Sequence, residues 1–575
     1  MTKVLDEERL SEPGTGSGPG GEPATKRPPH AILRTLVLKE VHDLALTLRF
    51  MVGTVLAVTL AALAAYVGSL DYNARLDSYQ TKIKINRDNL TQTSVYSFLR
   101  PTAVRPPEPL SILHRGLEGR VGTDFGVSVD TENTEASGEN RGNEYLAIFS
   151  EIDLTVIVTV ILGLLALLFT FDAVCGEREG GTLKLAMSYS LARWQLLLGK
   201  YLGALITLLI PTAMACIASL LVIGFVANVH FGVPEVVCIV LIFALYAVYL
   251  SLLLLAGLVI SSFVQRSSIA LVFSAFLWFF FVAIVPNLAT MVPDFIGNRA
   301  RVYQTAREGL RQADRDMETA LQGIPDPRDL DSQKTSDPMA LYYFAVNNRG
   351  GGLTAFSCET GDSKYYERLR HYFGDQLIPL SLKFASRRAE VWRQYVRYRE
   401  RQAAMARGLS FLSPGAVLSN SAGFLAGTSD ADYEHFIALA TQYRSTFLNY
   451  LRGKRAFDSR RWFTEEPEGT DYSWTTVLLG KTADEMAATG QDPADVINKL
   501  LQNHETWTKM ERVDADMRAR PDWNLSLGDL PAFTYQRLST GAVLVHALPE
   551  IGYLLILALI LFLVAYVRFL RYDVR

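Results

Sequence analysis

The sequence predicts an α-helical polytopic membrane protein with six transmembrane helices and a mostly α-helical extracytoplasmic domain formed from two long loops. Of its 575 residues, 49% are hydrophobic, and the mean hydropathy is positive at +0.15. Charged residues nevertheless make up 20% of the chain. This mixture indicates membrane spans combined with sizeable water-facing parts.

Uninterrupted apolar stretches define the predicted spans. Each is about 20 residues long, which is the length that an α-helix needs to cross the hydrocarbon core. They cover residues 50–70, 152–174, 200–228, 234–262, 268–292 and 545–568. Pro211, Pro286 and Pro549 lie in three of them, and membrane helices tolerate proline when neighbouring groups satisfy the freed carbonyls.

The distribution of Lys and Arg predicts that both termini are cytoplasmic. The connections that carry these residues are 175–200, 263–267 and the tail 569–575. The short loop 229–233 carries neither, and short loops rich in Lys and Arg face the cytoplasm. Segments 71–149 and 293–540 then face outward, because long segments cross largely regardless of their charge.

The N-terminal region before the first span divides into two parts. Residues 1–30 are predicted to be a disordered cytoplasmic tail, since 11–29 is rich in Gly, Pro and Ser. Residues 31–49 form an amphipathic pattern, with Lys39, His42 and Arg49 opposite an apolar arc. This pattern predicts a helix on the cytoplasmic membrane surface, although the same residues are also compatible with a simple extension of the first span.

The two long segments read mainly as helix and loop. Segment 71–149 begins with a helical pattern, which the prolines after residue 100 interrupt. Segment 293–540 contains three helical patterns, at 299–322, 380–407 and 431–452. Residues 323–340 and 453–473 read as loops.

Residues that would carry chemistry in this chain are not found together in the sequence. The nearest approach to a nucleotide-binding P-loop is Gly480-Lys481-Thr482, where Thr475 stands in place of the first glycine. His435 stands beside acidic residues, but an exposed helix face explains that position better than a metal site does. We therefore expect no catalytic residue, no metal and no cofactor in this chain, and its net charge of -3 gives no reason to expect nucleic acid as a partner.

One helical stretch in the second long segment is rich in arginine. Its interleaved aromatic residues are Trp392, Tyr395 and Tyr398, and the arginines that would meet an anion at the outer surface are Arg388, Arg393, Arg397 and Arg401. The alternative is an exposed amphipathic helix whose aromatic side chains pack on their own domain.

The connection 175–199 follows the second span and precedes the third. It places Glu177, Arg178 and Glu179 where the span ends and then continues as a short amphipathic helix on which Leu183, Met187 and Trp194 share a face. Such a helix either floats at the membrane surface or serves as an element that a soluble partner grips. Composition leaves both interpretations open.

The same connection resembles the one between the second and third spans of ABC-2-type transporter permeases. The matching residues are Glu177, Arg178, Glu179, Gly181, Thr182, Leu183, Arg193, Gly199 and Lys200. The proline that usually precedes the arginine is missing, and this chain has Ser190-Leu191-Ala192 there. Lys39 and Glu40, with Arg49, resemble the family's membrane-surface helix. Residues 105–118 and 412–444 are similar to outer segments of ABC-2 permeases with large extracytoplasmic insertions, including relatives of gliding-motility-associated permeases.

The resemblance implies partners and a coupling role. In that family the connection docks into a separate ATPase subunit, present in two copies, which binds the ATP and Mg. Leu183, Met187 and Trp194 would make the buried contacts of docking, and Arg178 and Glu179 the polar ones. A second permease, identical or related, and membrane lipids are also expected, in the inner membrane of a bacterial cell.

Three functions compete at this point. The first is export or extraction of a substrate, and the second is transmission of force to an extracytoplasmic protein partner without transport. The third is an enzymatic outer domain, for which the sequence offers no clustered carboxylates, metal ligands or nucleophile.

Overall fold

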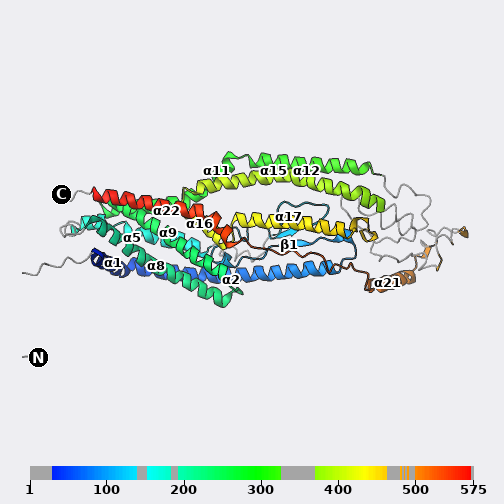
Figure 1. Ribbon diagram of the computed structural model, residues 1–575, viewed down its shortest axis with the longest axis horizontal. Helices are drawn as coiled ribbons and strands as arrows, with labels where there is room; N and C mark the ends of the chain where they lie inside the picture. Colours follow the sequence, from blue (N-terminus) through cyan, green and yellow to red (C-terminus); the bar gives the residue numbers. More distant parts are fainter. Residues whose placement is uncertain are drawn as a thin grey trace, which may run out of the picture.

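A computed structural model shows an elongated molecule with a helical bundle at one end and a second domain at the other (Figure 1). The structure describes residues 29–138, 152–182, 192–324, 370–462 and 502–571, together with scattered residues between 480 and 500. The predicted disordered tail therefore lies almost wholly outside the described residues, as does most of the predicted loop 323–340.

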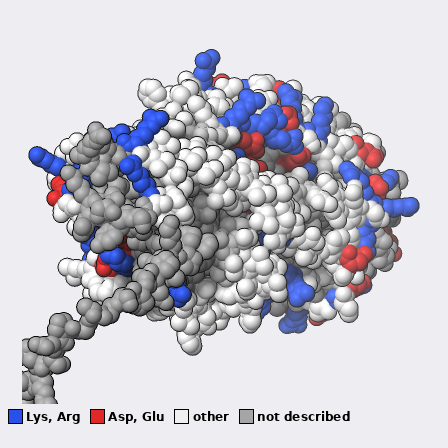
Figure 2. Space-filling model, turned by 60° about the vertical axis from the view of Figure 1, so that its left-hand side comes forward, with Lys and Arg blue, Asp and Glu red and all other residues white. Residues whose placement is uncertain are grey.

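Among the residues that the structure describes, six helices are long and apolar enough to cross a membrane, which confirms the predicted fold class. They are Leu48–Thr91, Leu154–Glu179, Arg193–Val226, Val233–Phe263, Ser267–Pro293 and Thr540–Leu570. Figure 2 shows a broad surface free of Lys, Arg, Asp and Glu, with charged side chains gathered toward its two sides. Such a surface suits contact with the hydrocarbon core, where an ionised side chain is costly.

The helix before the first span is separate from it. Helix α1 (Pro29–Ala45) ends before α2 (Leu48–Thr91), and Thr47 adopts an extended conformation between them. The Thr47 hydroxyl accepts a hydrogen bond from the Phe50 amide, which caps α2. The chain therefore bends here, and Arg49 belongs to the first span rather than to the surface helix in which the sequence pattern placed it.

Two glycines allow α1 to pack closely on α8 (Arg193–Val226). A Cβ atom on Gly203 would lie 2.5 Å from the Cβ of Glu40, and one on Gly199 would lie 3.1 Å from that of Leu36. Real Cβ atoms essentially never approach as closely as 2.5 Å, and 3.1 Å is tighter than most of their contacts. Gly203 therefore allows the short distance between the two helices, and Gly199 gives room beside it. Helix α1 therefore packs as part of the bundle. The helix of the third span begins at Arg193, whereas the sequence predicted that the span starts at residue 200.

The second and fifth spans each contain a wider, π-helical turn. In the second span, α4 (Leu154–Ile157) leads through η3 (Val158–Leu162) to α5 (Gly163–Thr170). In the fifth, α10 (Ser267–Phe279) leads through η4 (Phe280–Ile284) to α11 (Val285–Ile296). The fourth and sixth spans, α9 (Val233–Phe263) and α22 (Thr540–Leu570), are continuous helices. Nothing in the apolar composition of these stretches signals the π turns, which are often found at functional positions.

Both long loops contribute to one second domain, called the loop domain below. The first span continues as a single helix to Thr91, well beyond the predicted end at residue 70. Beyond it, β1 (Thr102–Val104) pairs antiparallel with β2 (Asp124–Gly126). Within the described part of the second loop, four further α-helices belong to this domain: α12 (Arg299–Gln322), α15 (Ile378–Ser410), α17 (Asp430–Gly453) and α21 (His504–Arg518).

The core of the loop domain joins residues that are far apart in the sequence. Helices α12 and α15 lie side by side, and α17 lies between them and the far half of α2 (Figure 1). Phe125 from the first loop is buried in one cluster with Phe373, Phe436 and Trp462 from the second. The two loops therefore form a domain together, as the sequence predicted.

One helix of the second loop lies in the bundle instead. Helix α16 (Pro414–Ala426) buries Val417 and Leu418 in the same cluster as residues of α9 and α22. The Ser421 hydroxyl donates to the Glu550 carboxylate of α22 at 2.9 Å. With 13 residues, α16 is too short to cross a membrane, but an apolar helix of this length suits a re-entrant or buried position. The sequence analysis assigned all of 293–540 to the extracytoplasmic segment, and the position of α16 in the bundle differs from that assignment.

A buried ionic cluster lies where the bundle meets the loop domain. Arg75 of α2 contacts Asp71 at 3.0 Å and Glu118 at 2.8 Å, and it donates to the Ser111 hydroxyl at 3.0 Å. Arg105 lies 3.5 Å from the other oxygen of Glu118. All four charged side chains are at most 8% exposed. The cluster therefore attaches the first loop to α2, the helix of the first span.

Glu108 extends this contact to the last span. Its carboxylate lies 3.4 Å from Arg537, which precedes α22, and Arg537 lies 3.4 Å from Glu235 at the start of α9. Burial raises the pKa of Glu108 to about 7, although Arg537 and Arg105 oppose the rise. Glu118 and Asp432 add to it as neighbouring negative charges.

The raised pKa predicts that Glu108 makes stability fall as the pH rises. The native state binds more protons than the unfolded chain between the ordinary carboxyl pKa of 4.5 and about 7, so this contribution is complete below 4.5 and lost as the pH passes 7. Thermal unfolding in detergent from pH 5 to 8 should show wild type losing stability relative to Glu108→Gln. A difference between the two proteins that does not change with pH would contradict this. Glu308→Gln, on the exposed face of α12, is the matched control.

Candidate coupling site

The connection after the second span begins with a short helix, α6 (Cys175–Glu179), that is attached to the bundle by its backbone. The amides of Val174 and Cys175 donate to the Ser261 hydroxyl at 2.9 and 3.1 Å. That hydroxyl satisfies donors which would otherwise be left free at a helix N-terminus. The position of α6 relative to α9 is therefore set by hydrogen bonds as well as by packing.

Two glycines end α6. Gly181 has a φ of +71°, and no atom lies within 4 Å of the position where its Cβ would be. A left-handed residue just beyond a helix end is usually glycine, because other residues are strained there. The Thr182 hydroxyl donates back to the Glu177 carbonyl at 3.2 Å. The chain thus turns at the end of α6, and residues 178 to 182 are exposed.

Lys200 joins three elements through two carboxylates. Its ammonium group lies 2.6 Å from Glu177 of α6 and 2.9 Å from Glu40 of α1, and the Lys200 side chain is only 7% exposed. This geometry is typical of a buried charge that persists because it is paired. Glu177 therefore points inward and attaches the connection to α8 and α1 through Lys200. The other acidic residue of the motif, Glu179, accepts hydrogen bonds from the Ser267 amide and hydroxyl at 3.2 and 2.5 Å.

A second ion pair holds the start of the first span. Arg49 lies 3.2 Å from Asp172, donates to the Leu168 carbonyl at 3.1 Å, and lies over the Phe171 ring at 5.0 Å. The ends of the first and second spans are therefore linked next to the connection. Lys39, which also belongs to the predicted surface helix, is largely exposed. Its ammonium group lies 4.0 Å from Asp43, which is a long distance for an ion pair.

The structure divides the predicted coupling residues. Leu183 and Met187 lie outside the described residues. Arg193 and Trp194 form the first turn of α8, because Ala192 is extended and interrupts the single helix that the pattern favoured. Arg193 donates to the Leu570 carbonyl at the end of α22, and Trp194 is 43% exposed. Arg178 is exposed at the end of α6.

The family motif included Lys200, but the sequence did not identify this residue as the centre of an ion cluster with Glu40 and Glu177. Asp172, Ser261 and Ser267 were not predicted as site residues. The signal for Lys200 and Asp172 was a charged residue at the edge of an apolar run, where a partner is needed. The two serines give no such signal.

The arginines of α15 have partners within the loop domain. Arg388 lies 2.7 Å from Asp314, Arg397 lies 3.0 Å from Glu390, and Arg393 contacts Glu132. Trp392 and Tyr395 form an aromatic cluster with Tyr303 of α12. This geometry favours the alternative in which the helix packs on its own domain, and contact with an external anion, including at Arg401, stays an untested prediction.

The arrangement defines a class of protein, namely a multi-pass helical bundle in which ion pairs and hydrogen bonds hold a charged connection between two spans. Among the described residues, the loop-domain side has no such connection. Residues 34–333 match the family model described as ABC-2 family transporter protein, which covers more than half of the chain, and the protein belongs to this family. It is a permease of the ABC transporter type. Residues 381–476 match a second model, described as Domain of unknown function (DUF3526).

Two curated relatives are similar to part of the chain. A probable ABC transporter permease protein NosY from Pseudomonas aeruginosa is 38% identical over 136 residues, which is 22% of this chain and 47% of the relative. A probable ABC transporter permease protein NosY from Stutzerimonas stutzeri is 40% identical over 81 residues, which is 14% of this chain and 29% of the relative. The chain thus spans less than half the length of each relative.

Proposed function

We propose that this permease converts ATP hydrolysis in a separate ATPase subunit into movement of its helical bundle, and so exports or extracts a substrate. Two ATPase copies and a second permease would complete the complex in the bacterial inner membrane, and ATP and Mg would bind to the ATPase. Both termini would be cytoplasmic. The Lys and Arg residues of the short connections support this orientation, as does the position of α1 and the end of α22 at the bundle end opposite the loop domain (Figure 1).

The observation that carries the proposal is the double ion pair of Lys200. The exposed residues of the connection, Arg178 to Thr182, lie directly beside Glu177, and Glu177 is joined through Lys200 to α8 and α1. A partner that displaces the exposed turn would therefore displace the third span and the surface helix with it. The Arg49–Asp172 pair would pass the same displacement to the first span.

Replacing Glu177, Arg178 and Glu179 together with alanine tests the proposal. We expect the permease to lose ATPase assembly, or its stimulation of ATP hydrolysis, because both the exposed turn and its attachment are removed. The measurement is ATPase activity and co-purification in the reconstituted complex. The matched control is Glu511→Ala with Arg512→Ala, which removes exposed charges of the same kinds from α21. ATPase stimulation equal to wild type would overturn the coupling role.

A second function has its own supporting observation. The buried cluster around Arg75 and Glu108 makes the loop domain continuous with three spans, which suits transmission of force to an extracytoplasmic protein partner. A transport assay in vesicles, beside affinity capture of proteins on the loop domain, separates the two. Transport without a captured partner supports export, and a partner captured in an ATP-dependent manner without transport supports force transmission.

A further inference from the structure

A cavity of about 710 Å³ lies where the bundle meets the loop domain. Its walls come from the first two turns of the second span, from η4, from the end of α15 and from α16. Its volume lies within the range of about 300–1,000 Å³ that is usual for small-molecule sites. The cavity therefore has room for a ligand of that size.

The wall formed by the membrane-spanning helices is apolar. Val156 and Val160 line it from the second span, and Phe281, Val282 and Ala289 line it from the fifth. These residues lie at the loop-domain ends of their spans. An apolar chain has favourable contacts along such a wall, whereas a polar group would lose its hydrogen bonds there.

Hydrogen bonds from other elements hold this wall in place. The Tyr249 hydroxyl donates to the Thr159 carbonyl at 3.3 Å, and the Ser413 hydroxyl donates to the Phe281 carbonyl at 2.5 Å. The two carbonyls belong to the π turns η3 and η4. Side chains from α9 and from the residue that caps α16 thus fix both wider turns where they line the cavity. A wall that is formed before the ligand arrives needs less ordering on binding.

His114 of the first loop is a buried polar side chain of this cavity, and it is only 4% exposed. Its Nδ1 atom lies 3.2 Å from the Asp153 carboxylate and 3.1 Å from the Thr155 hydroxyl. Asp153 also accepts from the amides of Val156 and Arg115, at 2.8 and 3.0 Å. Because an ionised carboxylate only accepts hydrogen bonds, the neutral ring carries its proton on Nδ1 and presents Nε2 as an acceptor.

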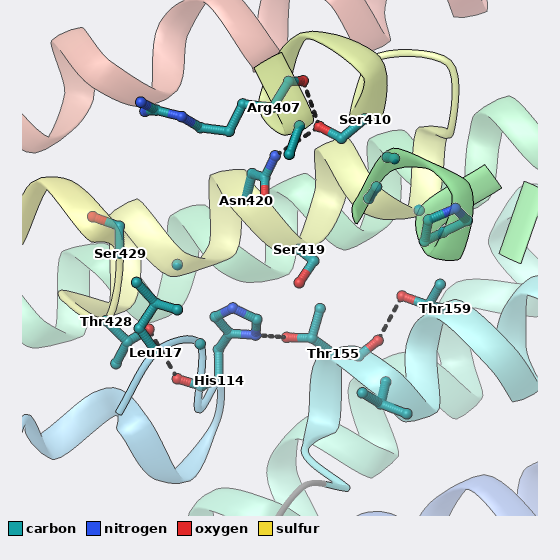
Figure 3. Close-up of a pocket in the computed structure, with 18 of the residues that line it drawn as sticks. His114, Leu117, Thr155, Thr159, Arg407, Ser410, Ser419, Asn420, Thr428 and Ser429 are labelled. Atoms are coloured by element: carbon teal, nitrogen blue, oxygen red, sulfur yellow. Dashed lines mark hydrogen bonds between the residues drawn. The ribbon is translucent and has the colours of Figure 1, made fainter. Parts of the chain in front are cut away.

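The Nε2 atom of His114 has no hydrogen-bond partner among the residues that the structure describes. It lies beside Gly423 of α16, where an added Cβ would be 3.5 Å away. Figure 3 shows the His114 ring and the Ser419 hydroxyl of α16 reaching into the same space. A buried acceptor without a partner is unfavourable, so a ligand that donates a hydrogen bond to Nε2 gains affinity.

The charged groups that line the cavity already have partners. Arg407 lies 3.2 Å from Asp430, and it also acts on the carboxylates of Glu434 and Glu550, which do not line the cavity. Arg120 takes part in an interaction of its own. An ionised head group of either sign would have to compete with these contacts, at a cost that an uncharged head group avoids.

We propose that this cavity binds an uncharged amphiphile with a single apolar chain and a head group that carries hydroxyls. The chain lies along the wall of the second and fifth spans, and one hydroxyl meets His114 Nε2. A hydroxyl suits this position in both states of the ring, because it can donate to the neutral form and accept from the imidazolium. Binding at this site requires neither the ATPase nor the coupling role proposed above, so each can fail without the other.

Photolabelling of the full-length permease in nanodiscs tests the proposal. The probe is monopalmitin with a diazirine near the chain end, and adducts are mapped by mass spectrometry. We expect adducts on residues 156–160 and 281–289, competed by unlabelled monopalmitin. Three molecules should compete at least about tenfold less well: methyl palmitate, which has no hydroxyl, palmitoyl lysophosphatidylglycerol, which is anionic, and sphingosine, which is cationic. Equal competition by either charged molecule overturns the uncharged head group.

Two variants test the role of the histidine. His114→Asn keeps an N–H group for Asp153 but has no atom in place of Nε2, and Gly423→Ala crowds Nε2 with a methyl group at an ordinary contact distance. Each should reduce the advantage of monopalmitin over methyl palmitate from about tenfold to below about threefold. Gly408→Ala, at an open position of α15, is the matched control. An advantage that both variants leave unchanged overturns the hydrogen bond to His114.

Filling the cavity tests its location. Ser419→Trp and Ala406→Trp fill it from two different helices and should each lower labelling about tenfold, whereas Ser445→Trp, on the exposed face of α17, should not. Thermal unfolding of each variant identifies any that fails to fold. Labelling spread evenly over the apolar surface, or unaffected by both tryptophans in folded protein, overturns the site.

Discussion

Replacing Arg75 with methionine is expected to lower the free energy of unfolding by about 3–5 kcal/mol, because it removes the shortest ion pair of each of two buried carboxylates. Asp71 and Glu118 are at most 8% exposed and both contact the Arg75 guanidinium. Methionine fills much of the arginine stem's volume but offers no charge. Asp71 would then keep only Arg115, at 3.4 Å, and Glu118 only Arg105, at 3.5 Å.

Unfolding of the purified protein in detergent measures this effect. The matched control is Arg397→Met, whose partner Glu390 and whose own side chain are about half exposed, so that the expected loss is below about 1 kcal/mol. Adding Glu118→Gln to Arg75→Met should recover part of the stability, since it removes one of the carboxylates that lost a partner. Equal losses for Arg75→Met and Arg397→Met would show that the junction cluster contributes no more than a surface pair does.

Replacing Lys200 with methionine is expected to have the second large effect, on both stability and coupling. Glu40 and Glu177 would lose the ammonium group that lies within 3 Å of each, at a cost of about 3–5 kcal/mol. The connection would also lose its attachment to α1 and α8. Under the proposed function, the ATPase would still bind the exposed turn but would no longer move the bundle efficiently.

A neutral version of the cluster separates stability from coupling. In the triple variant Glu40→Gln, Lys200→Met, Glu177→Gln no buried charge is left unpaired, so stability should return toward that of wild type. Coupling, measured as ATPase stimulation in the reconstituted complex, should stay low because the attachment is still missing. Lys82→Met, which removes a one-third exposed lysine paired with Asp124 in the loop domain, is the control. Full coupling in folded Lys200→Met protein would contradict the role of the cluster.

Several features of the fold could be predicted because they follow from local sequence. The six spans are recognisable from composition alone, since a helix is the structure that satisfies its own backbone within a membrane. The end of the second span was also recognisable, because Glu177, Arg178 and Glu179 follow its apolar run directly. The match of residues 177 to 200 to a family pattern identified the region in which the connection lies.

Other features depend on contacts between distant residues. The apolar sequence of α16 looks like part of a water-facing loop until α9 and α22 are placed beside it. Arg75 and Glu118 are separated by 43 residues, and nothing near either of them indicates the other. Arg388 and Arg393 seemed available for an external anion, because Asp314 and Glu132, which pair with them, lie in α12 and in the first loop.

The amino-acid pattern alone predicted that this chain crosses a membrane six times, that its second long loop contains long helices, and where its charged connection stands. These properties depend on composition and on spacings of a few residues, which act within one element. The pairing of Lys200 with two helices, the ionic junction at Arg75 and the cavity between two π turns came only from the folded arrangement. Each requires side chains from three or more separate elements to meet, and such meetings are decided by how the helices pack.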